Sequence, residues 1–116
     1  TTFGGNPVSC AAAGAVLRTI DHPEFMKQIE EKGALFSELL EHPKVKAIRR
    51  IGLMIAIELE NEQDVNKAIE LALNDGVIIY WFLSTRNAFR ISPPLTISSA
   101  EIRKSSSILQ KVFDRL

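Results

Sequence analysis

The chain of 116 residues has the length of one domain, and 46% of its residues are hydrophobic, which is enough apolar material for one core. Fourteen Lys and Arg residues balance fourteen Asp and Glu residues without a basic block, which excludes nucleic acid and anionic membranes as leading partners. No apolar run approaches the roughly 18 residues of a membrane span, and no leader precedes the first helix, so we expect a soluble chain.

The chain begins without Met, in the turn-like stretch TTFGGNP, which is typical of a segment taken from a longer protein. Hydroxyl, aromatic and glycine residues here precede a helix start, where backbone N–H groups could converge on an anion. The stretch lacks the spacing and the lysine of a P-loop. Taken alone, it therefore favours a glycine turn before a helix.

The first predicted helix runs from Pro7, with Asn6 as its N-cap, to about Ile20. The small residues at positions 11–15 would let another helix approach closely. Cys10 lies beside them and is the only cysteine, so it cannot form an internal disulfide, and its apolar setting predicts a buried packing residue. This cysteine usage indicates a reducing, cytoplasmic compartment.

A second, amphipathic helix is predicted after Pro23 and should end at EHPK, residues 41–44. Asp21 and Glu24 resemble a capping box around Pro23. Apolar residues then recur at helical spacing: Phe25, Ile29, Phe36, Leu39 and Leu40.

Two neighbouring strands are predicted next, at residues 44–50 and 53–59, with Gly52 between them. The second alternates apolar and other side chains, which indicates a half-buried strand. Asn61 can cap a third helix that ends at NDG, residues 74–76. The apolar positions of this helix follow the i, i+3, i+4 rule: Val65, Ala68, Ile69, Ala72 and Leu73.

The last part of the chain predicts a hairpin and a final helix. VIIYWFL, residues 77–83, is rich in strand-forming residues, and a turn at 84–87 leads to a strand at 89–91 that Pro93-Pro94 ends. Ser98 and Glu101 form a second capping box. One face of the final helix is apolar: Ile102, Leu109, Val112, Phe113 and Leu116. The predicted fold is α/β in the α+β sense, a small, mainly antiparallel sheet covered by helices.

Few residues are candidates for chemistry. His22 and His42 each precede a proline at an element boundary without a second ligand at metal spacing, so we interpret them as turn or capping residues and expect no metal site. The carboxylates are scattered along helix faces, and no general base stands out.

Arg90 lies on a strand between Phe89 and Ile91, so alternation predicts that its guanidinium faces away from their apolar side chains. A guanidinium near a core is costly unless it meets a carboxylate. Two interpretations remain open, a structural ion pair and recognition of a ligand's carboxylate.

Three stretches, in this order, resemble consecutive landmarks of the class III aminotransferases, the pyridoxal-phosphate family of acetylornithine, ornithine and 4-aminobutyrate aminotransferases. They are TTFGGNPVSCAAAGAVL at 1–17, RRIGLMIAIEL at 49–59 and FRISPPLTIS at 89–98. The resemblance covers essentially the whole chain but only about the last third of a family member. It implies that residues 1–20 are a phosphate-contacting turn and an interdomain helix, and that residues 21–116 are the C-terminal small domain of a fold-type I aminotransferase.

The resemblance also implies roles for single residues. Thr2 would bind the phosphate of pyridoxal phosphate across a dimer interface, with Thr1 as a second contact. Arg90 would bind a substrate carboxylate, or be held by an acidic residue while another group is bound. The lysine that carries the cofactor lies upstream of the glycine turn in the family, so this chain supplies no catalytic residue and we expect it to be inactive alone. The implied partners are the large cofactor-binding domain of the same parent chain, a second subunit in a homodimer, and amino acid and 2-oxo acid substrates.

The activity implied for the parent protein is transfer of an amino group from an amino acid or ω-amine donor to a 2-oxo acid such as 2-oxoglutarate. Two alternatives remain open: an aminomutase or racemase-type member of the same family, and a stand-alone α/β interaction module without a catalytic role. Tyr80, Trp81 and Phe82, before the arginine, depart from the pattern of the best-known members, which leaves the substrate open.

Overall fold

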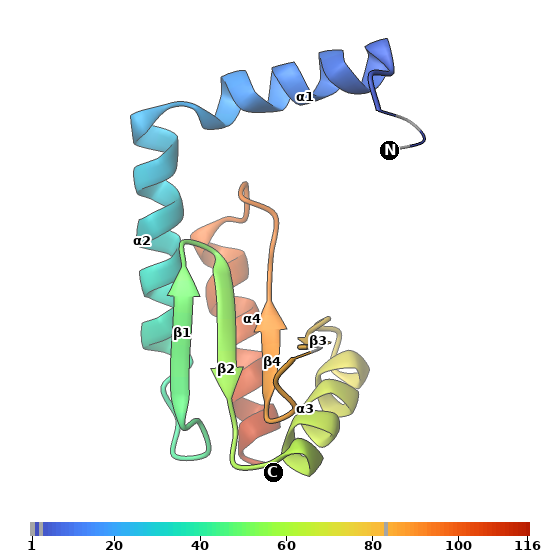
Figure 1. Cartoon of the computed structure of the whole chain (residues 1–116). Helices are drawn as coiled ribbons and strands as arrows, with labels where there is room; N and C mark the ends of the chain where they lie inside the picture. Colours follow the sequence, from blue (N-terminus) through green and yellow to red (C-terminus); the bar gives the residue numbers. More distant parts are fainter. Residues whose placement is uncertain (1, 3, 83) are drawn as a thin grey trace.

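The computed structural model describes residues 2, 4–82 and 84–116, which form four helices and one four-stranded sheet (Figure 1). The elements follow one another as α1 (Pro7–Ile20), α2 (Pro23–Leu39), β1 (Ala47–Ile51), β2 (Met54–Glu58), α3 (Glu62–Asn74), β3 (Tyr80–Trp81), β4 (Ala88–Ile91) and α4 (Ser99–Phe113). Among these described residues, no helix has the length and apolarity needed to cross a membrane.

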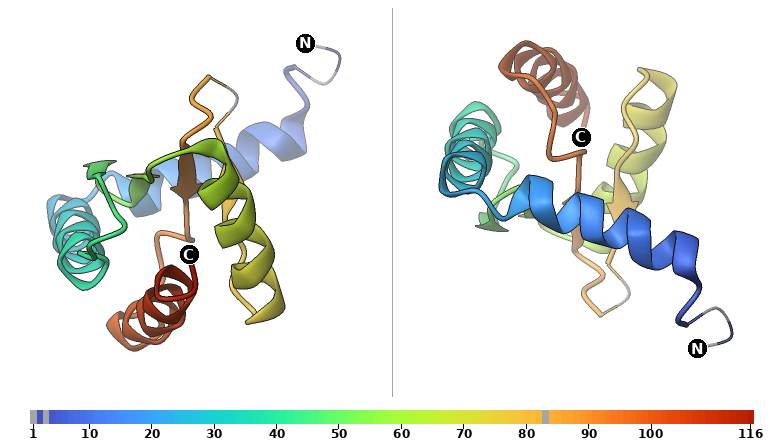
Figure 2. Two further views of the ribbon diagram at one scale, coloured as in Figure 1. Left: turned by 90° about the horizontal axis from the view of Figure 1, so that it is seen from below. Right: turned by 90° about the horizontal axis from the view of Figure 1, so that it is seen from above.

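The sheet has the strand order β1-β2-β4-β3, and each neighbouring pair is antiparallel. Figure 2 shows α2, α3 and α4 on one side of this sheet, while the described residues place no helix on the other side, which we call the open face. The prediction of a small antiparallel sheet covered by helices is confirmed. Because only one face is covered, β2 alternates buried residues with more exposed ones along its length.

The core lies between the sheet and α2, α3 and α4. Ile55 and Ile57 of β2 and Phe89 of β4 are fully buried on the helix side. The predicted apolar face of the last helix also lies in the core, where Ile102, Leu109, Val112 and Phe113 have no more than 1% of their surface exposed. Burying a side chain of this size stabilises the fold by about 1.5–3 kcal/mol.

The helix caps predicted at Asn61 and at Ser98 are confirmed. The Asn61 side chain accepts a hydrogen bond from the backbone N–H of Asp64 at 2.9 Å. At the start of α4, the Ser98 hydroxyl accepts from the Glu101 backbone N–H at 3.2 Å, and the Glu101 carboxylate accepts from the Ser98 backbone N–H at 2.8 Å. The hydrogen bond from the Ser98 backbone, followed by that from the Ser98 hydroxyl, holds the pKa of Glu101 below its ordinary value.

The capping box predicted around Pro23 is wrong. His22, not Asp21, is the N-cap of α2, and its side chain makes no capping hydrogen bond. Asp21 lies one residue too early because it ends α1, where its backbone N–H donates to the Leu17 carbonyl at 2.9 Å. Only Asp21 and His22 separate the two helices, and the histidine in the N-cap position has no side-chain oxygen with which to cap α2.

The predicted strand at 77–83 is much shorter in the structure, where β3 contains only Tyr80 and Trp81. The first residues after α3 instead close that helix: Val77 N–H donates to the Ala72 carbonyl at 2.8 Å, and Gly76 N–H donates to the Leu73 carbonyl at 3.1 Å. Gly76 has a φ of +88°, as a Schellman motif requires. The backbone N–H of Val77, which the prediction placed in the strand, is therefore used to end α3.

The prediction that Cys10 is buried is wrong, because Cys10 is exposed and α1 has no buried residue. The helix turns away from α2 and extends past the end of the sheet (Figure 1). The radius of gyration of 16.3 Å accordingly exceeds the roughly 13 Å expected of a compact chain of this length. The α1 helix therefore lies outside the core formed by the rest of the chain.

Candidate functional site

Arg90 lies on the open face of the sheet. Its neighbours on β4, Phe89 and Ile91, are 0% and 7% exposed and point into the core, whereas Arg90 is exposed. The predicted alternation around this arginine is therefore confirmed. The arginine is carried by a strand whose other side is held by the core, so its backbone position is well defined.

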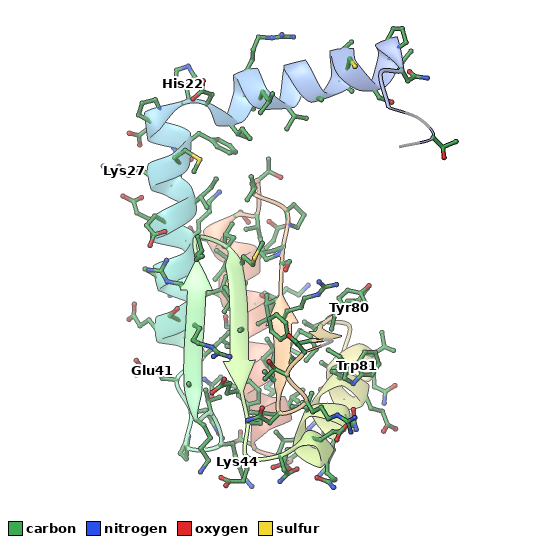
Figure 3. All side chains as sticks on the ribbon, viewed as in Figure 1. His22, Lys27, Glu41, Lys44, Tyr80 and Trp81 are labelled. Atoms are coloured by element: carbon green, nitrogen blue, oxygen red, sulfur yellow. The ribbon has the colours of Figure 1, made fainter. Side chains whose placement is uncertain are left out.

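A row of four residues crosses the sheet at Arg90. The strand register places Arg49 opposite Ala56, Ala56 opposite Arg90, and Arg90 opposite Tyr80. The carbon at the centre of the Arg90 guanidinium lies 5.6 Å from the centroid of the Tyr80 ring. Small Ala56 on the other side leaves room beside the guanidinium. Figure 3 shows Tyr80 at the edge of the sheet, toward α3.

Arg90 has no ion-pair or hydrogen-bond partner among the described residues, unlike several other arginines. Arg49 pairs with Glu58 at 2.5 Å, and Arg50 pairs with Glu30 at 2.5 Å. Arg86 and Arg115 also contact carboxylates. Within the described part of the chain, the structural ion pair considered for Arg90 is therefore not formed. The N–H donors of its guanidinium are therefore available to a carboxylate that does not belong to the described residues.

Two cavities border Arg90. One of about 630 Å³ is also lined by Phe36 of α2, Ile91 of β4 and Pro93 in the loop after β4. The other, of about 450 Å³, lies on the side of β3. Arg90 and Tyr80 line both cavities. The pair thus borders two hollows, either of which could receive a group attached to a carboxylate.

The N-terminal turn holds the predicted phosphate-binding residues. Thr2 is exposed in this turn, whereas Thr1 lies outside the described residues. The Asn6 side chain accepts hydrogen bonds from the N–H groups of Val8 and Ser9, at 2.9 and 3.2 Å. Asn6 is therefore the N-cap of α1, as predicted, and its side chain uses these two helix-start donors.

The turn nevertheless fits a phosphate group. The first turn of α1 contains no acidic residue, and a threonine hydroxyl can donate to a phosphate oxygen. Gly5 has a φ of +81°, which a glycine adopts without strain, and among the described residues other than its chain neighbours no atom lies within 4 Å of where its Cβ would be. Thr2 would hold the phosphate by its hydroxyl, beside the positive end of the α1 dipole.

The structure does not bring the N-terminal turn and Arg90 together. The turn lies beyond the far end of α1, away from β4 (Figures 1 and 2). The two predicted contacts, with a phosphate and with a carboxylate, are thus at separate places on this chain.

The two histidines lie at turns, as predicted. His42 Nδ1 accepts a hydrogen bond from the Lys44 backbone N–H at 3.1 Å, so Nε2 is the nitrogen that donates to Asp114, at 3.2 Å. His22 precedes α2 and is exposed. In the described ranges of the chain, no three potential metal ligands gather into a group.

Comparisons with known proteins identify the family. The family model described as aminotransferase class-III matches residues 1–113. The acetylornithine aminotransferase of Lactococcus lactis subsp. lactis (strain IL1403) is 34% identical over 97% of this chain and 30% of its own length. The 4-aminobutyrate aminotransferase of Escherichia coli (strain K12) is 32% identical over 97% of this chain and 30% of its own length.

Solved structures agree in fold. An aminotransferase from Bacillus anthracis has a TM-score of 0.85 and 29% identity, over 100% of this chain and 30% of that chain. The ornithine aminotransferase from Toxoplasma gondii ME49 has a TM-score of 0.82 and 29% identity, over 99% of this chain and 28% of that chain. The resemblance seen in the sequence is confirmed. The chain spans about 30% of the length of the relatives that it matches, and it belongs to the class III aminotransferases.

Proposed function

We propose that this chain is the C-terminal small domain of a pyridoxal-phosphate-dependent aminotransferase. The parent enzyme would transfer an amino group from an amino acid or ω-amine donor to a 2-oxo acid such as 2-oxoglutarate. The family match over residues 1–113 supports the reaction class. The observation that carries the proposal for this chain is the exposed guanidinium of Arg90, which has no carboxylate partner in the described part of the chain. Arg90 would bind a carboxylate of the substrate.

The proposed domain organisation assigns residues 1–20 to a phosphate-contacting turn and an interdomain helix, and residues 21–116 to the small domain. Exposed apolar residues of α1 support this: Val8, Val16 and Leu17 are 78%, 57% and 60% exposed. Apolar side chains on a helix are stable when another element covers them. The large cofactor-binding domain of the same parent chain would cover them, within a cytoplasmic homodimer.

Pyridoxal phosphate would be held in the full-length protein with Thr2 and Thr1 on its phosphate. When bound, the cofactor supplies an electron sink for chemistry at the carbon that carries the amino group. Arg90 contributes binding and orientation. Its planar fork fixes both oxygens of a carboxylate, so the amino or oxo group on the same molecule is held in one position.

The test is an assay of the full-length protein with amino acids and ω-amines as donors and 2-oxoglutarate as acceptor. Formation of glutamate in equal amount to the oxo product of the donor is the expected result. Isomerisation or racemisation of one substrate without glutamate formation would instead identify the aminomutase or racemase-type alternative. The 116-residue chain alone is the control, and it should form no glutamate.

The 116-residue chain alone also tests whether the lysine that carries the cofactor lies in the part of the parent protein outside this chain. Pyridoxal phosphate followed by borohydride should not label one lysine stoichiometrically. Several lysines already make surface contacts: Lys27 pairs with Glu31 at 3.8 Å, and Lys32 donates a hydrogen bond to the Leu95 carbonyl at 3.3 Å. Stoichiometric labelling of a single lysine would contradict the assignment.

A further inference from the structure

Tyr80 and Arg90 form a cross-strand pair on the open face. They are directly opposite in the register of β3 and β4, so their side chains leave the sheet on the same side. The 5.6 Å between the guanidinium carbon and the ring centroid is within the roughly 6 Å over which a cation is attracted to an aromatic face. The Tyr80 ring is therefore the aromatic partner of a guanidinium that has no carboxylate within the residues described.

The neighbouring residue ties this short strand to a helix. Trp81 is opposite Phe89, whose side chain is in the core, so Trp81 and Tyr80 leave β3 on opposite sides. The Trp81 indole N–H donates a hydrogen bond to the side-chain oxygen of Asn66 on α3, at 2.7 Å. Figure 3 shows Trp81 beside α3. A strand of only two residues has few ladder bonds, so this side-chain contact helps to hold Tyr80 in register.

The contact with the Tyr80 ring leaves the N–H donors of the Arg90 guanidinium free to bind a carboxylate. An aromatic ring attracts the cation through its π face and accepts no strong N–H hydrogen bond, whereas a carboxylate binds the donors of the guanidinium fork. An arginine side chain has many rotamers, and ordering them on binding lowers affinity. A ring that already limits those rotamers reduces this ordering cost.

We propose that Tyr80 is a positioning residue for Arg90, acting through its ring, and that the Trp81–Asn66 hydrogen bond holds the strand that carries it. This inference rests on the proposed role of Arg90 as the group that binds a substrate carboxylate. The ligand class is a carboxylate on a group small enough to enter one of the two cavities that Arg90 and Tyr80 line. Tyr80 does not touch the reacting atoms, so its effect is on binding.

The experiment compares Tyr80→Phe and Tyr80→Leu in the full-length holoenzyme. The probe is glutarate, a dicarboxylate without an amino or oxo group, and its dissociation constant is measured by calorimetry. Tyr80→Leu should raise this constant about two- to fivefold, the effect of an exposed cation–π contact. Tyr80→Phe keeps the ring and should match wild type. The Michaelis constant for the 2-oxo acid should rise in parallel, while kcat stays unchanged.

Two further variants make the result decisive. Asn66→Ala removes the acceptor for Trp81 and should weaken glutarate binding in the same direction, which also tests the inference if Tyr80→Leu does not fold. Leu73→Ala, on an exposed residue of α3, is the control and should leave binding unchanged.

Arg90→Lys separates this inference from the proposed function. If Arg90→Lys weakens glutarate binding but Tyr80→Leu and Asn66→Ala do not, the positioning role of Tyr80 is wrong and the role of Arg90 stands. If Arg90→Lys binds glutarate as wild type does, the carboxylate-binding role of Arg90 fails, and the role of Tyr80 fails with it.

Discussion

Gly33, in the middle of α2, lies against the backbone of Gly52 in the turn between β1 and β2. A Cβ at Gly33 would be 2.1 Å from the Gly52 carbonyl oxygen. Gly52 has a φ of +54°, and a Cβ built there would be 2.8 Å from a methyl carbon of Ile29. The two glycines therefore allow α2 and the β1–β2 turn to approach closely, and the salt bridge between Arg50 and Glu30 lies beside this contact.

We predict that Gly33→Ala destabilises the chain. A backbone carbonyl cannot move aside as a flexible side chain can, so the clash should cost about 1–3 kcal/mol, more than the gain of up to about 1 kcal/mol in helix propensity. Urea unfolding measures the difference. Gly14→Ala in α1 is the matched control, because its Cβ would meet only the end of the Arg18 side chain, at 3.4 Å. Equal or greater stability of Gly33→Ala would show that the helix and turn separate easily.

Arg90→Lys should impair substrate recognition in the full-length enzyme. Lysine keeps the charge but lacks the planar fork, so a contact of about 2–3 kcal/mol is lost, which is about a 30- to 150-fold fall in kcat/KM for at least one carboxylate-bearing substrate. Steady-state kinetics with both substrates measure this. Arg103→Lys, on an exposed residue of α4, is the control. Wild-type kinetics combined with a lowered Tm would make Arg90 a structural residue.

Thr2→Ala should weaken retention of pyridoxal phosphate by the full-length enzyme. A hydrogen bond to a charged group contributes about 1.5–3 kcal/mol, and alanine removes the donor. Equilibrium dialysis of the cofactor measures the change, and Thr2→Ser is the control because it keeps the hydroxyl. Unchanged cofactor affinity in Thr2→Ala would leave Thr2 as a turn residue only.

The capping box of α4 should make stability depend on pH. Hydrogen bonds from Ser98 lower the pKa of Glu101 in the folded chain, so its contribution to the free energy of unfolding is present above the unfolded pKa. This contribution is lost as the pH falls through the lower, folded value. The stability difference between wild type and Glu101→Gln should therefore be largest near neutral pH and shrink in acid. Urea unfolding at several pH values measures it, and a constant difference would contradict the expectation.

Local chemistry made much of this fold predictable. Asn61 and the Ser98–Glu101 pair marked two helix starts because a cap depends on residues three apart. The alternation around Arg90 placed its side chain on the face opposite the core. These features need no knowledge of the rest of the chain.

Other features depend on tertiary contacts that local patterns do not contain. The register that sets Tyr80 against Arg90 follows from how β3 meets β4, and an aromatic residue ten positions before the arginine was its only signal in the sequence. The helical pattern could not predict the close approach at Gly33, because the Gly52 carbonyl that it meets lies in a distant turn. The exposure of Cys10 was missed because an apolar, Ala-rich helix predicts burial without saying which part of the protein covers it.

The isolation of α1 from the core has a consequence for the stability of this helix. This helix has 14 residues and buries none of them, and isolated helices shorter than about 12–15 residues are marginal in water. Its amide hydrogens should therefore exchange with solvent through local opening, independently of the cooperative unit formed by the sheet and the other helices. Thr2 precedes this helix, so we expect the geometry of its turn to be fixed only when a neighbouring surface stabilises α1, and the cofactor contact proposed for Thr2 would then depend on assembly.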